Sequence, residues 1–323
     1  MRKIALEEAF VTDTAALEWM KGNPFINSQW FEHVAARLPD FTEHRLQDMD
    51  EHGIDIQVLS LTTPGVQGQP DPGLAVQEAK RANDFLAGVV AENPDRFGGF
   101  AALPLQDPQA AVGELARAVE DLGLHGALVN GSTLGHYLDE PQFAPVWAEL
   151  ERLDVPLYLH PNDESARDPW AVLDGYPELG GAMYRWNADT GAHAMRIVLS
   201  GIFDRHPGVK LILGHMGELL PFQLFRLDSR YKFANSHPLE HLPSHYIRNN
   251  ILATTSGTFD VPALLGAVAA IGVDNILFSV DYPYEHTAEA VAFLDRLPLA
   301  PADLAKIAHK NAERVLKIAP TTE

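Results

Sequence analysis

Polar residues able to bind a metal or move a proton stand where apolar runs of the sequence end. Glu7 and Glu8 close the first such run, His160 closes the fifth, His215 the sixth and Asp281 the last. Imidazole and carboxylate groups together form sites for divalent cations. A single His or Asp in such a place is more often a helix cap or a loop contact. Two histidines and two carboxylates in equivalent places favour a metal site, provided that the fold brings the run ends together.

Eight of these runs occur along the chain, at residues 3–7, 55–62, 97–103, 126–130, 157–160, 210–215, 250–255 and 275–281. Several are almost continuous in Ile, Val and Leu, which is typical of parallel strands buried on both faces. Helix-like segments separate them, at residues 71–93, 141–153, 188–205, 218–230, 262–271 and 286–297, with a further start at Asp107. Asp71-Pro72 and Asp107-Pro108 are typical pairs of N-cap and first-turn residues.

This repeated alternation predicts an α/β fold, a single (β/α)₈ barrel (TIM barrel) spanning residues 1–323, with the active site at the carboxyl ends of the strands. A doubly wound open sheet is the alternative, weakened because no Gly-x-Gly-x-x-Gly turn follows a strand. The connections at 11–41 and 161–187 predict long loops on the catalytic face. Their aromatic residues could cover a bound ring or simply pack within the loops: Trp19, Trp30, Trp170, Tyr176, Tyr184 and Trp186.

The composition argues against several classes of partner. The formal net charge is −20, which disfavours nucleic acid and an anionic membrane surface, since both require clustered cations. An anionic substrate would need a local cation, such as a metal with one or two Arg residues. Because the chain has no cysteine, His and carboxylates are the available metal ligands. No apolar stretch suits a signal peptide or a membrane span, so a cytoplasmic location is expected.

Six stretches of the sequence, spread nearly from end to end, carry a resemblance to a known family. They are Lys3-Ile4-Ala5-Leu6-Glu7-Glu8-Ala9-Phe10, Pro94-Asp95-Arg96-Phe97, Gly126-Ala127-Leu128-Val129-Asn130, Phe203-Asp204-Arg205-His206-Pro207, Gly214-His215-Met216-Gly217-Glu218 and Ile276-Leu277-Phe278-Ser279-Val280-Asp281-Tyr282-Pro283. As a set they resemble the nonoxidative hydroxybenzoate decarboxylases of the amidohydrolase superfamily, which act on 2,3-dihydroxybenzoate, γ-resorcylate, salicylate and 5-carboxyvanillate. The resemblance implies a carboxy-lyase of aromatic compound catabolism, with one divalent metal ion per chain. Mn²⁺ is favoured over Mg²⁺ and Zn²⁺, and a homodimer or homotetramer is expected.

The resemblance also implies roles for the residues at the strand ends. Glu7, His160 and Asp281 match metal ligands, and Asp281 also matches the carboxylate that transfers a proton. His215 and Glu218 match a catalytic His and Glu beside the substrate. Glu218 could instead simply favour the N-terminus of a helix.

Three further residues match substrate-binding positions: Arg226, Arg45 and Asn130. Arg226 could equally be a cation on a surface helix. Asn130 also marks a departure, because binuclear hydrolases of the superfamily have a Lys at the end of the fourth strand. Ala9 is a second departure, since many relatives have a His there and only some decarboxylases share the Ala. One metal ion is therefore expected, with water or substrate filling the position next to Ala9.

The predicted reaction is metal-dependent, nonoxidative decarboxylation of an aromatic acid with a hydroxyl ortho to its carboxylate, reversible as carboxylation of a phenol. The metal would bind both oxygens of this small aromatic acid, and Asp281 would protonate the ring before CO₂ leaves. Two alternatives stay open. One is a mononuclear hydrolase of an ester, lactone or amide, and the other is a metal-binding barrel without catalysis.

Overall fold

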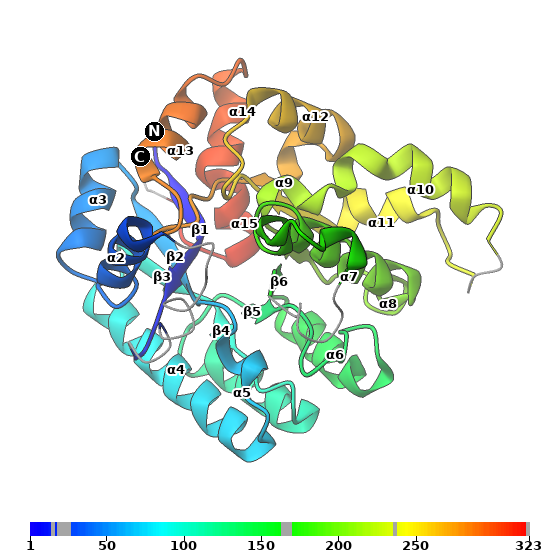
Figure 1. Cartoon of the computed structure of the whole chain (residues 1–323), viewed down its shortest axis with the longest axis horizontal. Coiled ribbons are helices and arrows are strands. Elements are labelled where there is room, and N and C mark those ends of the chain that lie inside the picture. Colours follow the sequence, from blue (N-terminus) through cyan, green and yellow to red (C-terminus); the bar gives the residue numbers. More distant parts are fainter. Residues whose placement is uncertain (14–16, 18–26, 163–169, 235–237, 321–323) are drawn as a thin grey trace.

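Parallel strands form the centre of the structure and helices surround them (Figure 1). This computed structural model describes residues 1–13, 17, 27–162, 170–234 and 238–320. The strands are β1 (Ile4–Phe10), β2 (Ile56–Leu61), β3 (Phe97–Gly99), β4 (Ala101–Ala102), β5 (Ala127–Asn130), β6 (Leu157–His160), β7 (Leu211–Leu213), β8 (Ile251–Thr254) and β9 (Ile276–Leu277). Every strand pairs in parallel with its neighbour in the sequence, within a sheet β1-β2-β3 or a sheet β4-β5-β6-β7-β8-β9.

Backbone contacts join the two sheets at both edges. The N–H of Phe100 donates to the carbonyl of Leu59 at 2.9 Å, across the short break between β3 and β4. On the other side, Leu6 forms a parallel bridge with Ser279, and its N–H donates to the carbonyl of Phe278 at 3.3 Å. The third predicted strand is thus interrupted at Phe100, while the other seven predicted strands each appear as one, mostly with shorter bounds.

Two hydrophobic clusters show which side chains the strands turn inward and outward. The inner cluster draws on most of the strands and contains Ile4, Leu6, Ile56, Val58, Phe100, Leu128, Tyr158, Ile212, Leu252 and Leu277. A larger cluster lies between the strands and the surrounding helices, with Phe10, Leu59 and Leu159 on its strand side. Side chains therefore alternate between an inner and an outer apolar layer, as the buried parallel strands predict.

The helices follow the strands in sequence. They are α2 (Ser28–Arg37), α3 (His44–His52), α4 (Pro72–Glu92), α5 (Pro108–Glu120), α6 (Ala144–Leu153), α7 (Arg185–Leu199), α8 (Ile202–Arg205), α9 (His215–Glu218), α10 (Leu224–Tyr231), α11 (Pro243–Asn250), α12 (Val261–Ile271), α13 (Thr287–Asp295), α14 (Pro301–Ala305) and α15 (Asn311–Leu316). The two predicted N-caps are confirmed, because Asp71 and Asp107 each accept backbone N–H groups of the first helical turn. Within the described ranges, no helix is long and apolar enough to cross a membrane.

The long connections contain more regular structure than the sequence indicates. Residues 11–41 include α2, whose start is capped by Asn27 accepting the N–H of Trp30 at 2.8 Å. Helix α7 begins at Arg185, inside the second connection, and a turn at Gly201 separates it from α8. Trp19 lies outside the described residues. Trp30 packs on Tyr284 with ring centroids 5.7 Å apart, so one loop aromatic reaches the wall of the pocket described below.

Candidate metal and active site

A bulge in β1 turns Glu7 toward the pocket. The pairing of β1 with β2 shifts between Leu6 and Glu8, and Glu7 has a φ of 67°. An extra residue in a strand resets the alternation of side chains. Leu6 therefore belongs to the inner cluster, while Glu7 and Ala9 both line the pocket.

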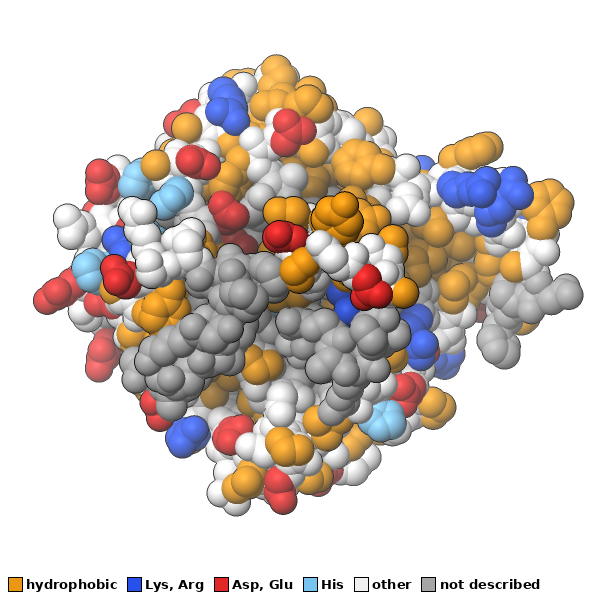
Figure 2. Space-filling model, viewed as in Figure 1, with side chains coloured by type: hydrophobic (Ala, Val, Ile, Leu, Met, Phe, Trp, Pro, Cys, Tyr) orange, Lys and Arg blue, Asp and Glu red, His pale blue; other side chains and the backbone are white. Residues whose placement is uncertain are grey.

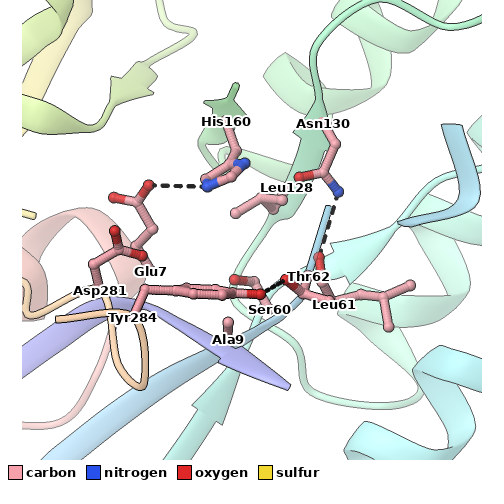
Figure 3. A pocket seen from close by; sticks show the side chains of 10 residues that line it. All are labelled: Glu7, Ala9, Ser60, Leu61, Thr62, Leu128, Asn130, His160, Asp281 and Tyr284. Atoms are coloured by element: carbon pink, nitrogen blue, oxygen red, sulfur yellow. Dashed lines mark hydrogen bonds and ion pairs between the residues drawn. The ribbon is translucent and has the colours of Figure 1, made fainter. Parts of the chain in front are cut away.

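Glu7 within β1, His160 at the end of β6 and Asp281 after β9 converge in one pocket (Figure 3). One ligand atom from each lies within 4.8 Å of the other two. Glu7 Oε1 is 3.4 Å from His160 Nε2, and it is buried with no hydrogen-bond partner among the described residues. A buried carboxylate oxygen without a partner is costly. These donors fit one divalent cation, because such an ion would satisfy that oxygen and use two carboxylates and one imidazole.

The hydrogen bonding and burial of His160 favour a neutral imidazole that can act as a metal ligand. Its Nδ1 lies 2.7 Å from the carbonyl of Pro161, so Nδ1 carries the proton and donates it there. The lone pair of Nε2 then faces Glu7. Burial lowers the pKa of His160, which favours this neutral form.

His215 and Glu218 form a buried pair beside these ligands. His215 Nδ1 lies 2.8 Å from Glu218 Oε1, and Asn187 Nδ2 donates to Glu218 Oε2 at 3.0 Å. The other ring nitrogen of His215 is 3.7 Å from Glu7 Oε1 and 3.9 Å from Asp281 Oδ2. Burial of the His215 ring opposes its charge, but the carboxylates of Glu218 and Glu7 raise its pKa well above the usual value. The Glu218 carboxylate thus lies against the His215 ring, within the four-residue α9, where Met216 and Gly217 depart from helical geometry.

Glu8 supports the backbone at Asp281, although it does not line the pocket. Its carboxylate is fully buried and accepts the N–H groups of Val280 at 3.0 Å and Tyr282 at 3.2 Å. These two residues flank Asp281, whose φ of 77° is unusual for a residue with a side chain. The two hydrogen bonds hold β1 against the segment that presents Asp281.

Arg45 lies away from the pocket, in contrast to the predicted contact with substrate. Its guanidinium is buried and donates to the carbonyl of Ala9 at 2.6 Å and to Gln57 Oε1 at 3.0 Å. It also lies over the ring of Tyr282, 4.5 Å from the centroid. Helix α3 packs Arg45 behind β1, so these contacts brace the strand from outside the pocket. Because α3 is polar on most of its surface, the sequence pattern could not show that the face carrying Arg45 packs inward.

Asn130 lies on the pocket wall next to His160, its partner in the pairing of β5 with β6, and across from Glu7 and Asp281 (Figure 3). Its Nδ2 donates to the carbonyl of Leu61 at 3.3 Å. That bond fixes the amide orientation and leaves Oδ1 buried without a partner in the described part of the chain. The sequence prediction missed Tyr284 and Thr62 on the same wall, where their hydroxyls are 2.5 Å apart. Tyr284 follows Asp281 by three residues, and this short spacing was the feature of the sequence that could have indicated its place in the pocket.

Arg226 does not line the pocket of its own chain. It is exposed on α10, which projects from the barrel with α11 (Figure 1). Large apolar side chains surround it in the sequence, with Phe222 54%, Phe225 87% and Phe233 81% exposed. Figure 2 shows hydrophobic side chains together with Lys or Arg side chains on this projection.

Comparison with known proteins identifies the family of this chain. A family model described as amidohydrolase matches residues 16–318. The chain belongs to the amidohydrolase family. It is 43% identical over 325 residues to γ-resorcylate decarboxylase of Rhizobium sp. (strain MTP-10005), with 98% of each chain covered. It is 40% identical over 333 residues to γ-resorcylate decarboxylase of Rhodococcus jostii (strain RHA1), again with 98% of each covered.

Solved structures of the family share the fold of this amidohydrolase. A 2,6-dihydroxybenzoate decarboxylase complexed with 2,6-dihydroxybenzoate matches with a TM-score of 0.93 and 42% identity, covering 98% of this chain and 100% of that one. A dihydroxybenzoic acid decarboxylase of Polaromonas sp. JS666 contains manganese and the inhibitor 2-nitroresorcinol. It matches with a TM-score of 0.91 and 40% identity, covering 99% of this chain and 98% of that one. The prediction of a TIM-barrel amidohydrolase is confirmed.

Gly214 provides a steric test of the metal site. A Cβ at this position would lie 2.9 Å from Glu7 Oε1, closer than real Cβ atoms essentially ever approach, and 3.0 Å from Oε2. The backbone of Gly214 suits alanine, with φ −67° and ψ −175°. We expect Gly214→Ala to displace Glu7 and to weaken Mn²⁺ binding roughly tenfold or more, measured by isothermal titration calorimetry.

Gly113→Ala is the matched control, since a Cβ on this glycine of α5 would meet no atom within 4 Å. It should leave Mn²⁺ affinity unchanged and stabilise the helix by up to about 1 kcal/mol. Equal Mn²⁺ affinity for Gly214→Ala and the wild type would show that Glu7 is not a ligand.

Proposed function

We propose that this amidohydrolase catalyses the metal-dependent, nonoxidative decarboxylation of an aromatic acid with a hydroxyl ortho to its carboxylate, and that the reaction runs in reverse as carboxylation of a phenol. One observation carries the proposal. A three-residue metal-ligand cluster lies in the pocket of a chain that matches 2,6-dihydroxybenzoate and γ-resorcylate decarboxylases over nearly its full length.

Glu7, His160 and Asp281 would hold one divalent ion, with Mn²⁺ favoured because relatives contain manganese. When bound, such an ion supplies a positive charge and a template that orients the two neighbouring oxygens of the substrate. A local cation also explains how a protein with a formal net charge of −20 attracts an anionic acid.

Asp281 is the proposed proton donor, since its carboxylate lies on the pocket wall near Glu7 and His215. In the decarboxylation direction, the carboxyl of Asp281 gives its proton to the ring carbon that bears the carboxylate. The bond between that carbon and the carboxylate then breaks, its electron pair returns to the ring, and CO₂ leaves. In the reverse direction, the carboxylate of Asp281 removes the ring proton. Protonation first avoids a free aryl carbanion.

The remaining residues orient the substrate and the proton donor. His215, charged and oriented by Glu218, presents Nε2 toward the metal ligands and can stabilise negative charge there. Leu61 and Leu128 offer apolar contacts for a ring. The free Oδ1 of Asn130 can accept a hydrogen bond from a polar substituent of the substrate.

A substrate panel tests the proposed reaction. The Mn²⁺-loaded protein should release CO₂ from ortho-hydroxybenzoates and should leave esters, lactones and amides intact. Asp281→Asn should lose most of this activity, by roughly a hundredfold or more, because general acid catalysis typically contributes that much. Hydrolysis of an ester or lactone by the same preparation, with no turnover of any hydroxybenzoate, would instead support a mononuclear hydrolase.

We further propose that the protein is a homodimer or homotetramer and that Arg226 binds substrate in the pocket of a neighbouring copy. Arg226 is exposed beside Phe222 and Phe225, and it is absent from the pocket lining of its own chain. An exposed patch of large aromatic residues is typical of an interaction surface. The expected cytoplasmic location stays a prediction.

Hybrid oligomers test this arrangement. Arg226→Ala and Asp281→Asn chains, co-expressed with different affinity tags, should each be nearly inactive as pure oligomers. A hybrid dimer contains one pocket with both intact residues, so it should regain about half of the wild-type activity. Arg230→Ala, which removes another exposed cation of α10, is the control and should keep wild-type kinetics. A hybrid no more active than its parents would place Arg226 outside the site of a second copy.

A further inference from the structure

Two hydroxyl groups contact one oxygen of the Glu7 carboxylate, Oε2. The hydroxyl of Tyr158, on β6, donates a hydrogen bond to Glu7 Oε2. Thr254, at the end of β8, has its hydroxyl 3.4 Å from the same oxygen and 3.0 Å from the Tyr158 hydroxyl. All three side chains are buried, and they come from three different strands. The contact is therefore part of the barrel interior.

The two oxygens of Glu7 consequently have different surroundings. Oε2 is held by the hydroxyls of Tyr158 and Thr254, whereas Oε1 has no hydrogen-bond partner among the described residues and lies 3.4 Å from His160 Nε2. Gly214 lies beside the same carboxylate and leaves no room for a side chain between them, since a Cβ there would lie 2.9 Å from Oε1. Oε1 is therefore the oxygen of Glu7 that lies without a hydrogen bond beside His160, in the cluster formed by Glu7, His160 and Asp281.

The position of Tyr158 in β6 explains how it reaches this oxygen. Side chains two residues apart in a strand point to the same side, so Tyr158 lies one layer below His160. Its ring packs against Phe100 in the inner apolar cluster, with ring centroids 5.8 Å apart. A carboxylate oxygen accepts hydrogen bonds, so the phenol hydroxyl of Tyr158 is the donor in its contact with Glu7.

We propose that Tyr158 is a positioning residue that restricts Glu7 to binding the metal through one oxygen, and that it thereby sets metal affinity. The hydroxyl of Thr254 assists it. The inference rests on the metal site of the proposed function, and it assigns to Tyr158 no contact with substrate. Groups that orient a metal ligand commonly change metal affinity 10–100-fold when removed.

Tyr158→Phe removes the hydroxyl and keeps the ring in the inner cluster. We expect the dissociation constant for Mn²⁺ to rise roughly 10–100-fold, measured by calorimetry on metal-free protein without substrate. In a crystal structure of the Mn²⁺-loaded variant, both oxygens of Glu7 should approach the ion, whereas the wild type should use one.

Tyr246→Phe is a matched control. The hydroxyl of Tyr246 donates to the carboxylate of Asp204, so its loss removes the same kind of bond in a buried tyrosine away from the site. The control should bind Mn²⁺ with wild-type affinity even where its melting temperature falls. This comparison separates a general loss of stability from an effect on the metal.

Wild-type affinity for Mn²⁺ in folded Tyr158→Phe would overturn the inference. Thr254→Val provides a second test if Tyr158→Phe does not fold, since it removes the other hydroxyl with little change in shape. It should weaken Mn²⁺ binding severalfold, and unchanged affinity would again contradict the proposal. Failure of the wild type to bind Mn²⁺ would instead refute the metal site itself, so the two failures are distinguishable.

Discussion

The site depends on backbone conformations that residues with side chains seldom adopt. Glu7, His215 and Asp281 have φ values of 67°, 48° and 77°. Each such residue costs of order 1–3 kcal/mol and persists only where its surroundings determine it. A bulge in the pairing of β1 with β2 accounts for the conformation of Glu7. The Glu218 carboxylate contacts the His215 ring. The Glu8 carboxylate accepts the backbone N–H groups of the residues on either side of Asp281. The stability of the fold offsets the cost of these conformations, which bring the three side chains to one site.

This arrangement places several carboxylates close together. A cation is therefore needed to balance their negative charge. Glu7 and Asp281 lie in one pocket of a protein with a formal net charge of −20. Hydroxyl and amide donors cover part of Glu7 and Glu218, but Glu7 Oε1 lacks a partner in the described part of the chain. A divalent ion would satisfy this oxygen and provide a positive charge that binds an anionic aromatic acid.

The sequence was most informative where polar residues interrupt apolar strands. Glu7, His160 and Asp281 could be predicted because parallel strands of a barrel bring their carboxyl ends to one face. Tyr158 could not, because a residue within a strand gives no sign of whether its neighbours across the barrel are polar. Glu8 was noted beside Glu7, but the sequence did not show that it would bind the backbone on both sides of Asp281. Arg45 matched a substrate-binding position, yet its helix packs it behind β1. Its role depends on tertiary contacts that no local pattern contains. Roles for Asp281, His215, Glu218, Arg226 and Asn130 stay predictions.

We propose above all that Asp281 delivers a proton to the ring carbon that carried the carboxylate. Decarboxylation of an ortho-hydroxybenzoate by Mn²⁺-loaded protein in D₂O, followed by NMR spectroscopy of the product, tests it most directly. We expect one deuterium at that carbon in the wild-type product, and we expect Asp281→Asn to lose most formation of the deuterated phenol. Undiminished formation of the deuterated phenol by Asp281→Asn would contradict it, as would a product without deuterium at that carbon.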